Sequence, residues 1–155
     1  MVKAVFFDID GTLSAPCYMT EGKLVVGFTD EGWFNHCNTL RENCYDYCKV
    51  VNPIKRYAIS KKASGARLYV LSVSQSEGER LGKIKFINDN YPGLFDDIIQ
   101  VEHNSDKVIV MSEYAENNSM NHSEIEIVED TYSIVLNAND NGFVATHVAS
   151  IVCDL

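Results

Sequence analysis

The sequence predicts an α/β fold with an open, doubly wound parallel sheet and helices on both faces. Short, continuous apolar segments alternate with amphipathic ones over most of the 155 residues, and Gly or Pro residues separate them. Strands that are apolar on both faces are typical of a parallel sheet covered by helices. The length and an apolar fraction of 46% fit one domain that spans residues 1–155.

The first strand is predicted at residues 3–7, and the acidic sequence Asp8-Ile9-Asp10-Gly11 follows it directly. The next interval, residues 14–51, is expected to be a small insertion made of a flap and one helix. Within it, residues 23–28 are expected to form one arm of a short hairpin. The helix is expected to begin at Asp30 or Glu31 and to reach about Val50.

The remaining segments continue the alternation of helices and strands. The predicted helices cover residues 53–64, 77–90, 105–116 and 132–139, and the predicted strands cover residues 68–73, 95–101, 125–128 and 143–148. Right-handed crossovers between parallel strands place the carboxyl ends of all strands along one edge of such a Rossmann-like sheet. Ligands are expected at that edge, near the point where the strand order reverses.

The charge of the chain is uneven and strongly acidic. Residues 1–80 contain 10 Lys or Arg against 9 Asp or Glu, whereas residues 81–155 contain 3 against 13. The net charge of −9 repels nucleic-acid backbones and anionic lipids, so we expect no nucleic-acid partner and no membrane partner. No apolar run approaches the ~20 residues of a membrane-spanning helix, and the first residues lack a signal-peptide pattern. These features predict a cytoplasmic protein.

The five cysteines are predicted to be thiols, because their number is odd and the chain is long enough to fold without disulfides. His36, Cys37, Cys44 and Cys48 are an alternative zinc cluster. A buried apolar stripe explains the cysteines better, because apolar residues fall at helical spacing at Trp33, Cys37, Leu40, Cys44, Tyr47 and Val51. The C-x-x-C and H-x-x-x-H pairs that favour zinc are absent from the sequence.

Polar residues follow the ends of the predicted strands. Asp8 and Asp10 follow the first strand, Ser72 ends the second and Glu129-Asp130 ends the fourth, while Lys107 opens the helix before that strand. Clustered carboxylates repel one another unless a cation lies among them, and Mg²⁺ prefers such oxygen ligands and shares its coordination with substrate phosphate. The residues therefore predict Mg²⁺-assisted phosphoryl chemistry, with Ser72 and Lys107 on the phosphoryl oxygens.

The same residues form motifs of a known family. Residues 6–13 read F-F-D-I-D-G-T-L, which resembles the first motif of the haloacid-dehalogenase-like (HAD) hydrolases, an apolar strand followed by D-x-D-G-T-[LV]. Val70-Leu71-Ser72, Lys107 and the segment 125–130 resemble the second, third and fourth motifs in the order that the family requires. The resemblance covers residues 3–13 and 54–150.

The resemblance implies a role for each of these residues. Asp8 would be the nucleophile that forms an aspartyl-phosphate, and Asp10 would be the general acid and base. Gly11 and Thr12 would adjoin the phosphoryl group, together with Ser72 and Lys107. Asp8, Asp130, the supporting Glu129 and the backbone carbonyl of Asp10 would bind Mg²⁺. Dehalogenases of the family lack an Asp at the position of Asp10, so Asp10 favours phosphatase or phosphotransferase chemistry.

Simpler explanations exist for several of these residues. Ser74 lies two residues after Ser72 and offers the same hydroxyl, so the phosphate ligand is one of the two. Lys83 and Lys85 compete with Lys107 for the basic motif, but on a helix they are more simply a solvated face. Glu129-Asp130 also has the composition of a helix cap. None of the four histidines is assigned a role.

Substrate choice in the family is commonly set by an inserted cap, and residues 14–51 are smaller than a full helical cap. We therefore expect a site that is open to a larger substrate, to a substrate on another macromolecule or to closure by a neighbouring subunit in a homo-oligomer. The aromatic residues of the insertion, whose alternative role is core packing, are candidates for the rim of the site: Tyr18, Phe28, Trp33 and Phe34.

The sequence thus predicts a Mg²⁺-dependent phosphatase that acts on a small-molecule phosphate ester. Two other classes compete with it. A phospho-accepting signalling domain is disfavoured, because the third predicted strand is not followed by a lone Asp. A catalytically silent binding module of the same fold is disfavoured by the intact Asp8, Asp10, Lys107 and Asp130.

Overall fold

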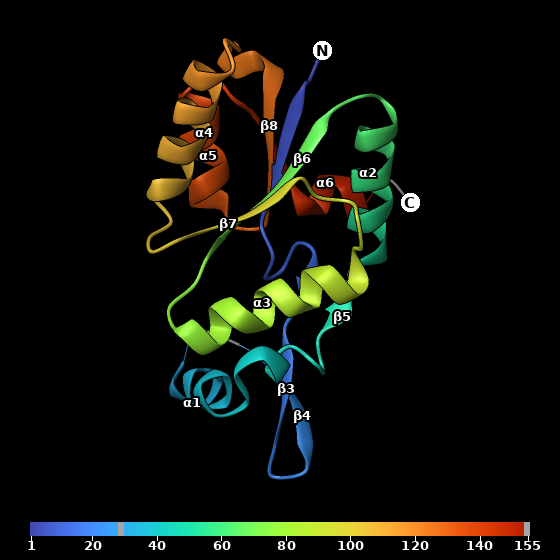
Figure 1. Cartoon of the computed structure of the whole chain (residues 1–155), viewed down its shortest axis with the longest axis vertical. Coiled ribbons are helices and arrows are strands. Elements are labelled where there is room, and N and C mark those ends of the chain that lie inside the picture. Colours follow the sequence, from blue (N-terminus) through green and yellow to red (C-terminus); the bar gives the residue numbers. More distant parts are fainter. Residues whose placement is uncertain (28–29, 154–155) are drawn as a thin grey trace.

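The centre of the molecule is a five-stranded parallel sheet. The computed structural model describes residues 1–27 and 30–153. The strand order is β7-β6-β1-β8-β9 (Figure 1). The strands are β1 (Ala4–Phe7), β6 (Arg67–Val73), β7 (Asp97–Val101), β8 (Ile125–Glu129) and β9 (Val144–His147). The predicted α/β class is confirmed, and the strand order reverses on either side of β1, which is the expected place for a ligand.

Strand β1 is buried on both faces because it lies between β6 and β8. Phe7 is in register with Val70 on one side and with Val128 on the other. Alternate β1 side chains enter two different apolar clusters: Val5 and Phe7 pack in one, and Ala4 and Phe6 pack in the other. This alternation explains why the strand is a continuous apolar run rather than an alternating one.

Helices cover both faces of the sheet (Figure 1). Helices α4 (Asp106–Asn117) and α5 (Tyr132–Asp140) pack over the cluster that contains Phe6. Helices α2 (Asn52–Ala63) and α6 (Val148–Val152) lie on the opposite face, and α3 (Glu77–Asn90) contributes Phe86 and Ile87 to the cluster that contains Phe7. The short 3-10 helix η2 (His122–Glu124) precedes β8.

The insertion after β1 contains the predicted hairpin. Strands β3 (Cys17–Thr20) and β4 (Lys23–Val26) pair antiparallel and project from the body of the molecule, at the bottom of Figure 1. Two shorter strands, β2 (Ser14–Ala15) and β5 (Lys49–Val50), close the base of the insertion. Helix α1 (Glu31–Leu40) follows the hairpin, and the Trp33 backbone N–H donates to the Asp30 carboxylate at its start (2.9 Å).

The prediction of one helix from about Asp30 to Val50 is wrong. Helix α1 ends at Leu40, because Arg41 has a positive φ of 50°, and the 3-10 turn η1 (Arg41–Asn43) follows. The turn brings Cys44 and Tyr45 beneath α3, where a Cβ on Gly82 would lie 2.3 Å from the Cys44 Sγ. Packing against α3 therefore overrides the helical periodicity of the sequence.

The predicted apolar stripe is only partly buried, because the helix ends at Leu40. Trp33, Cys37 and Cys44 are buried, but Leu40 and Tyr47 are exposed. His36 Nε2 lies 2.8 Å from the Cys44 carbonyl oxygen rather than beside the thiols, and all five cysteines are free. Within residues 1–27 and 30–153, no group of His and Cys ligands has metal-binding geometry, so the zinc alternative is not supported. No helix of the described chain is both long and apolar enough to cross a bilayer.

Candidate active site

Side chains from three neighbouring strands meet at one edge of the sheet. Asp8 follows β1, Ser72 lies near the end of β6, and Glu129 ends β8 beside Asp130. All four line a cavity of about 550 Å³, together with Lys107 from the first turn of α4. The carboxyl ends of parallel strands share one edge, so strand pairing alone brings these distant parts of the sequence together.

Lys107 connects the two buried carboxylates of this edge. Its Nζ donates to Asp8 Oδ1 at 2.9 Å and to Glu129 Oε2 at 2.7 Å, and all three side chains are almost fully buried. The other Glu129 oxygen accepts the backbone N–H groups of Asp130 (3.0 Å) and Thr131 (3.2 Å). Both oxygens of Glu129 are thus occupied, and Glu129 fixes Lys107 beside Asp8.

Burial dominates the electrostatics of these acids. It raises the pKa of Asp8 to about 7, against the opposing effect of the Lys107 ammonium. Burial likewise raises the pKa of Glu129 and that of Asp130. Burial lowers the pKa of Lys107, but the neighbouring Asp8 and Glu129 raise it by more. The net pKa lies above its ordinary value, so the ammonium stays charged. The site is a low-dielectric environment in which charge interactions are strong.

Three carboxylates lie close enough to share one cation. Asp8, Glu129 and Asp130 each offer an oxygen atom within 4.8 Å of the others. Gly11 makes room for this group: its φ is +79°, and a Cβ at this position would lie 2.1 Å from Asp130 Oδ2. Because the Glu129 oxygens already accept hydrogen bonds, Asp8 and Asp130 are the carboxylates with free coordination capacity. Hard oxygen ligands of this kind fit Mg²⁺.

The Asp10 side chain lies apart from that group. Its Oδ1 accepts a hydrogen bond from the Tyr45 hydroxyl (2.7 Å), and its Oδ2 lies 3.4 Å from Lys83 Nζ. Asp10 still lines the same cavity as Asp8. The carboxylate is therefore oriented by a residue of the insertion and by a residue of α3.

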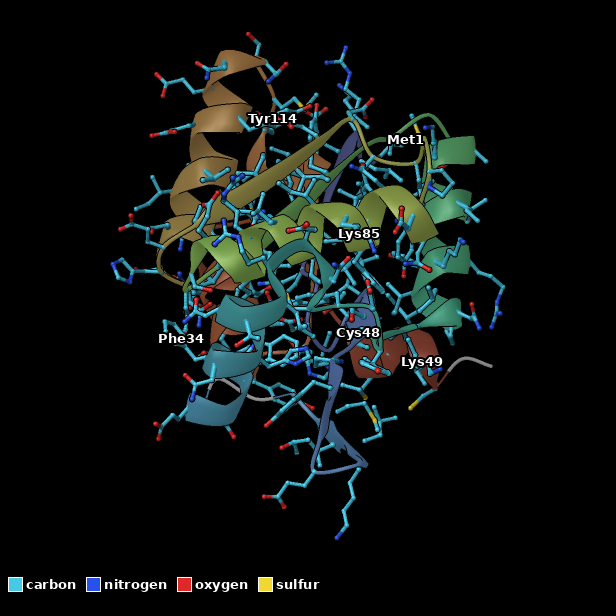
Figure 2. All side chains as sticks on the ribbon, turned by 60° about the horizontal axis from the view of Figure 1, so that its bottom comes forward. Met1, Phe34, Cys48, Lys49, Lys85 and Tyr114 are labelled. Atoms are coloured by element: carbon cyan, nitrogen blue, oxygen red, sulfur yellow. The ribbon has the colours of Figure 1, made fainter. Side chains whose placement is uncertain are left out.

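Lys83 is a buried residue of this site, so its assignment to a solvated helix face is wrong. Its Nζ donates to Ser72 Oγ (2.8 Å) and to the Val73 carbonyl, and it pairs with Glu79 Oε1 at 2.9 Å. Lys85, two residues later, does lie at the surface of α3, where it pairs with Asp46 (Figure 2). Burial lowers the pKa of Lys83, but Asp10 and Glu79 raise it above its ordinary value.

A signal for the burial of Lys83 is present in the sequence. Gly78 and Gly82 lie four residues apart on α3, and a Cβ on Gly78 would lie 2.1 Å from the Cys37 carbonyl oxygen. Two glycines at this spacing allow a close approach of the insertion, which buries the adjacent Glu79 and Lys83. Two further neighbours of the site are not predicted from the sequence, because no local pattern marks them. Tyr45 donates to Asp10, and His147 Nε2 lies 2.8 Å from the Asp130 carbonyl oxygen.

The structure distinguishes Ser72 from Ser74. Ser72 lines the cavity and is held by Lys83, whereas the Ser74 hydroxyl donates to the Gln100 side chain and does not line the cavity. Gly11 lines the cavity as well. Thr12 does not: it is fully buried, and its hydroxyl has no hydrogen-bond partner among the described residues.

The insertion supplies part of the opposite wall. Trp33 lines the cavity, as do Pro16, Val26 and Gly27 of the hairpin segment. Of the other aromatic residues considered for the rim, Tyr18 packs edge-on against Trp33 inside the core, and Phe34 is exposed on α1 (Figure 2). Phe28 lies outside the described residues.

Comparison with solved structures gives the same architecture. A haloacid dehalogenase-like hydrolase from Bacteroides fragilis aligns with a TM-score of 0.61 at 16% identity, covering 92% of this chain and 85% of its own. A HAD family hydrolase from Streptomyces avermitilis aligns with a TM-score of 0.55 at 13% identity, over 94% of this chain and 69% of its own. D,D-heptose 1,7-bisphosphate phosphatase from Burkholderia thailandensis aligns with a TM-score of 0.53 at 13% identity, covering 91% of this chain and 74% of its own.

The sequence itself matches no family profile and no curated protein. The likeness to these structures therefore concerns the fold. Combined with the strand order, the acidic edge of the sheet and the insertion after the first strand, it shows that this chain has the fold of the haloacid-dehalogenase-like hydrolases.

Proposed function

We propose that this protein is a Mg²⁺-dependent phosphatase that hydrolyses a small-molecule phosphate ester through an aspartyl-phosphate on Asp8. The observation that carries the proposal is the position of the Asp8 carboxylate. It lines the cavity, lies 2.9 Å from the buried Lys107 ammonium and shares a three-carboxylate group with Asp130. A nucleophile beside a cation and a metal site is the arrangement that phosphoryl transfer requires.

In the first step, an Asp8 oxygen attacks phosphorus and the bond between phosphorus and the ester oxygen breaks. Asp10 gives its proton to the departing oxygen, which leaves as an alcohol. In the second step, Asp10 takes a proton from water as the water attacks the same phosphorus, and the bond to Asp8 breaks. Inorganic phosphate leaves, and Asp8 and Asp10 return to their initial states.

The phosphoryl oxygens develop charge that the chain must stabilise. Lys107 and the Ser72 hydroxyl line the cavity next to Asp8, and both are fixed by buried partners. Groups that are fixed in advance stabilise a transition state without the cost of reorganisation. Glu129 and Lys83 therefore act as positioning residues for Lys107 and Ser72.

Asp8 and Asp130 would hold Mg²⁺, and the backbone carbonyl of Asp10 is the third ligand that the resemblance implies. When bound, Mg²⁺ would neutralise charge on the phosphoryl oxygens. Glu129 would support this site indirectly, since its own oxygens are occupied by Lys107 and by two backbone N–H groups.

The proposal is tested by steady-state hydrolysis of a generic aryl phosphate with Mg²⁺, repeated with EDTA and with the nearly isosteric Asp8→Asn. We expect turnover that EDTA abolishes, that added Mg²⁺ restores and that Asp8→Asn lowers at least about 10³-fold. Asp140→Asn, an exposed carboxylate on α5, is the matched control and should match the wild type.

Each alternative predicts a different result. A phosphotransferase would transfer the phosphoryl group to an added alcohol faster than to water. A catalytically silent module would bind Mg²⁺, keep its fold and show no turnover under any condition, which would overturn the phosphatase proposal.

A further inference from the structure

The cavity has a charged floor and an uncharged roof. The floor consists of the strand ends that carry Asp8 and Asp130. The roof consists of residues of the insertion that line the cavity: Pro16, Val26, Gly27 and Trp33, of which Trp33 is almost fully buried. In an in-line displacement the leaving group departs on the side opposite the nucleophile, so the part of the substrate that leaves must face away from Asp8.

The charges around the cavity are unbalanced. Five of its described lining residues are carboxylates: Asp8, Asp10, Glu79, Glu129 and Asp130. Among the described residues that line it, Lys107 is the one cation, and its Nζ is shared by two carboxylates. Lys83 lies just behind the wall and is likewise committed, to Glu79 and Asp10. The Mg²⁺ that Asp8 and Asp130 would hold and Lys107 both serve the transferred phosphoryl group, so no cation among the described lining residues is left for a second anion.

The remaining polar groups of the wall are neutral. Gln75, Asn104 and Thr131 line the cavity and can hydrogen-bond to hydroxyl or amide groups. A carboxylate or a second phosphate on the leaving group would instead face the apolar roof, where none of the described lining residues is a cation. Burying such an anion without a partner is costly.

From this distribution, and resting on the proposed phosphatase function, we infer that the natural substrate is a phosphomonoester whose leaving group is uncharged and packs an apolar surface against Pro16 and Val26, which the buried Trp33 supports from behind. Bisphosphates and phosphorylated carboxylic acids are excluded as preferred substrates by the same charges. The roof thus selects the leaving group, while the floor performs the chemistry.

Two aryl phosphates of equal size test the inference. The first, para-(hydroxymethyl)phenyl phosphate, has a neutral leaving group, and the second, para-carboxyphenyl phosphate, adds one negative charge. We expect kcat/KM for the carboxylate compound to be about tenfold lower, as expected for one unpaired charge near a negative site. The difference should shrink in high salt, because added ions screen the repulsion.

A charge introduced into the roof should reverse this preference. Val26 is 56% exposed on β4 and lines the cavity, so Val26→Lys adds a cation to the wall without emptying the core. We expect the ratio of kcat/KM for the carboxylate compound to kcat/KM for the neutral compound to rise about tenfold in this variant, because only the carboxylate gains an ionic partner. Leu24→Lys is the matched control: Leu24 is 51% exposed on the same strand, two residues away, and does not line the cavity.

The outcomes separate the inference from the function on which it rests. If the wild type hydrolyses the carboxylate compound as fast as the neutral one, the inference is overturned and the phosphatase function stands. Equal responses of both compounds to Val26→Lys and Leu24→Lys would overturn the role of the roof. If neither compound is hydrolysed with Mg²⁺ by folded wild-type protein, the proposed function fails, and the inference fails with it.

Discussion

The floor and the roof of the cavity are built by opposite strategies. The floor buries Asp8, Lys107 and Glu129 almost completely, and each is held by a partner from another element, as Lys107 is by Glu129. The roof is a hairpin and one helix, with Leu24 and Val26 more than half exposed and a hydrogen-bonded ladder of only two strands. A change in the floor therefore disturbs both charge and fold, whereas the exposed hairpin positions Leu24 and Val26 can vary at little cost.

This contrast has a kinetic meaning. In the proposed function, floor residues contact the reacting atoms, so their loss should lower kcat. In the same proposal, roof residues face the part of the substrate that does not react, so their loss should mainly raise KM. The following substitutions test that division, from the largest expected effect on activity to the smallest.

Lys107→Met should have the largest effect of these. Removing one charged group that stabilises a transition state lowers kcat by about 10³-fold. It also leaves the buried Asp8 and Glu129 without a cation, which should lower the free energy of unfolding by about 3–5 kcal/mol in urea titrations. Adding Glu129→Gln should recover part of that stability and none of the activity. Recovery of kcat in the double variant would show that Lys107 only maintains the fold.

Gly11→Ala should lower kcat by about 100-fold. A Cβ at this position would lie 2.1 Å from Asp130 Oδ2, so the Asp130 carboxylate would have to move and the three-carboxylate group would be disturbed. Gly22→Ala is a close control. Gly22 has a similar φ of +73°, but a Cβ there would meet no atom within 4 Å. Both variants should lose about 1–2 kcal/mol of stability from the left-handed backbone, and only Gly11→Ala should lose activity. Equal kinetics in the two variants would contradict the role of Gly11.

Lys83→Met should lower kcat about 30-fold, since Ser72 and Asp10 each lose a partner that positions them. Lys85→Met, on the exposed side of the same helix, should keep wild-type kinetics. Adding Glu79→Gln to Lys83→Met should relieve the unpaired buried carboxylate and restore stability but not kcat. Wild-type kcat in the stabilised double variant would reduce Lys83 to a purely structural residue.

Lys83 also marks the limit of what the sequence could predict. The strands, the helix at 77–90 and the meeting of Asp8, Ser72, Lys107 and Asp130 follow from local apolar patterns and from one rule about parallel strands. The burial of Lys83 depends instead on a contact between α3 and the insertion, which lie far apart in the sequence. Local patterns contain no such information, so Lys83 resembles the solvated Lys85.

The break of the predicted helix at Arg41 has the same origin. Residues 41–50 keep apolar residues at helical spacing, but the chain must turn to place Tyr45 against Asp10 and to pair β5 with β2. Tertiary packing decides this segment and overrides local propensity. The parts of the site that arise from strand order are therefore predictable, and the parts that arise from packing of the insertion are not.

Gly27→Ala should have the smallest effect on activity, and that effect should be confined to KM. A Cβ at Gly27 would lie 2.7 Å from Trp33 Cε3, so the hairpin and the indole must move apart by a few tenths of an ångström or more. We expect KM for an aryl phosphate to rise about threefold to fivefold while kcat stays within about twofold, because the floor is untouched.

Trp33 is the only tryptophan of the chain, so its fluorescence reports the roof directly. Gly27→Ala should shift the emission maximum, and Leu24→Ala on the same hairpin should leave both the emission and KM unchanged. A shifted emission with unchanged KM would show that the roof moves without contacting the substrate. A side chain that contacts only the distal part of the leaving group binds substrate and transition state equally, so its loss changes KM and not kcat. A drop in kcat at constant KM would therefore assign Trp33 to the floor.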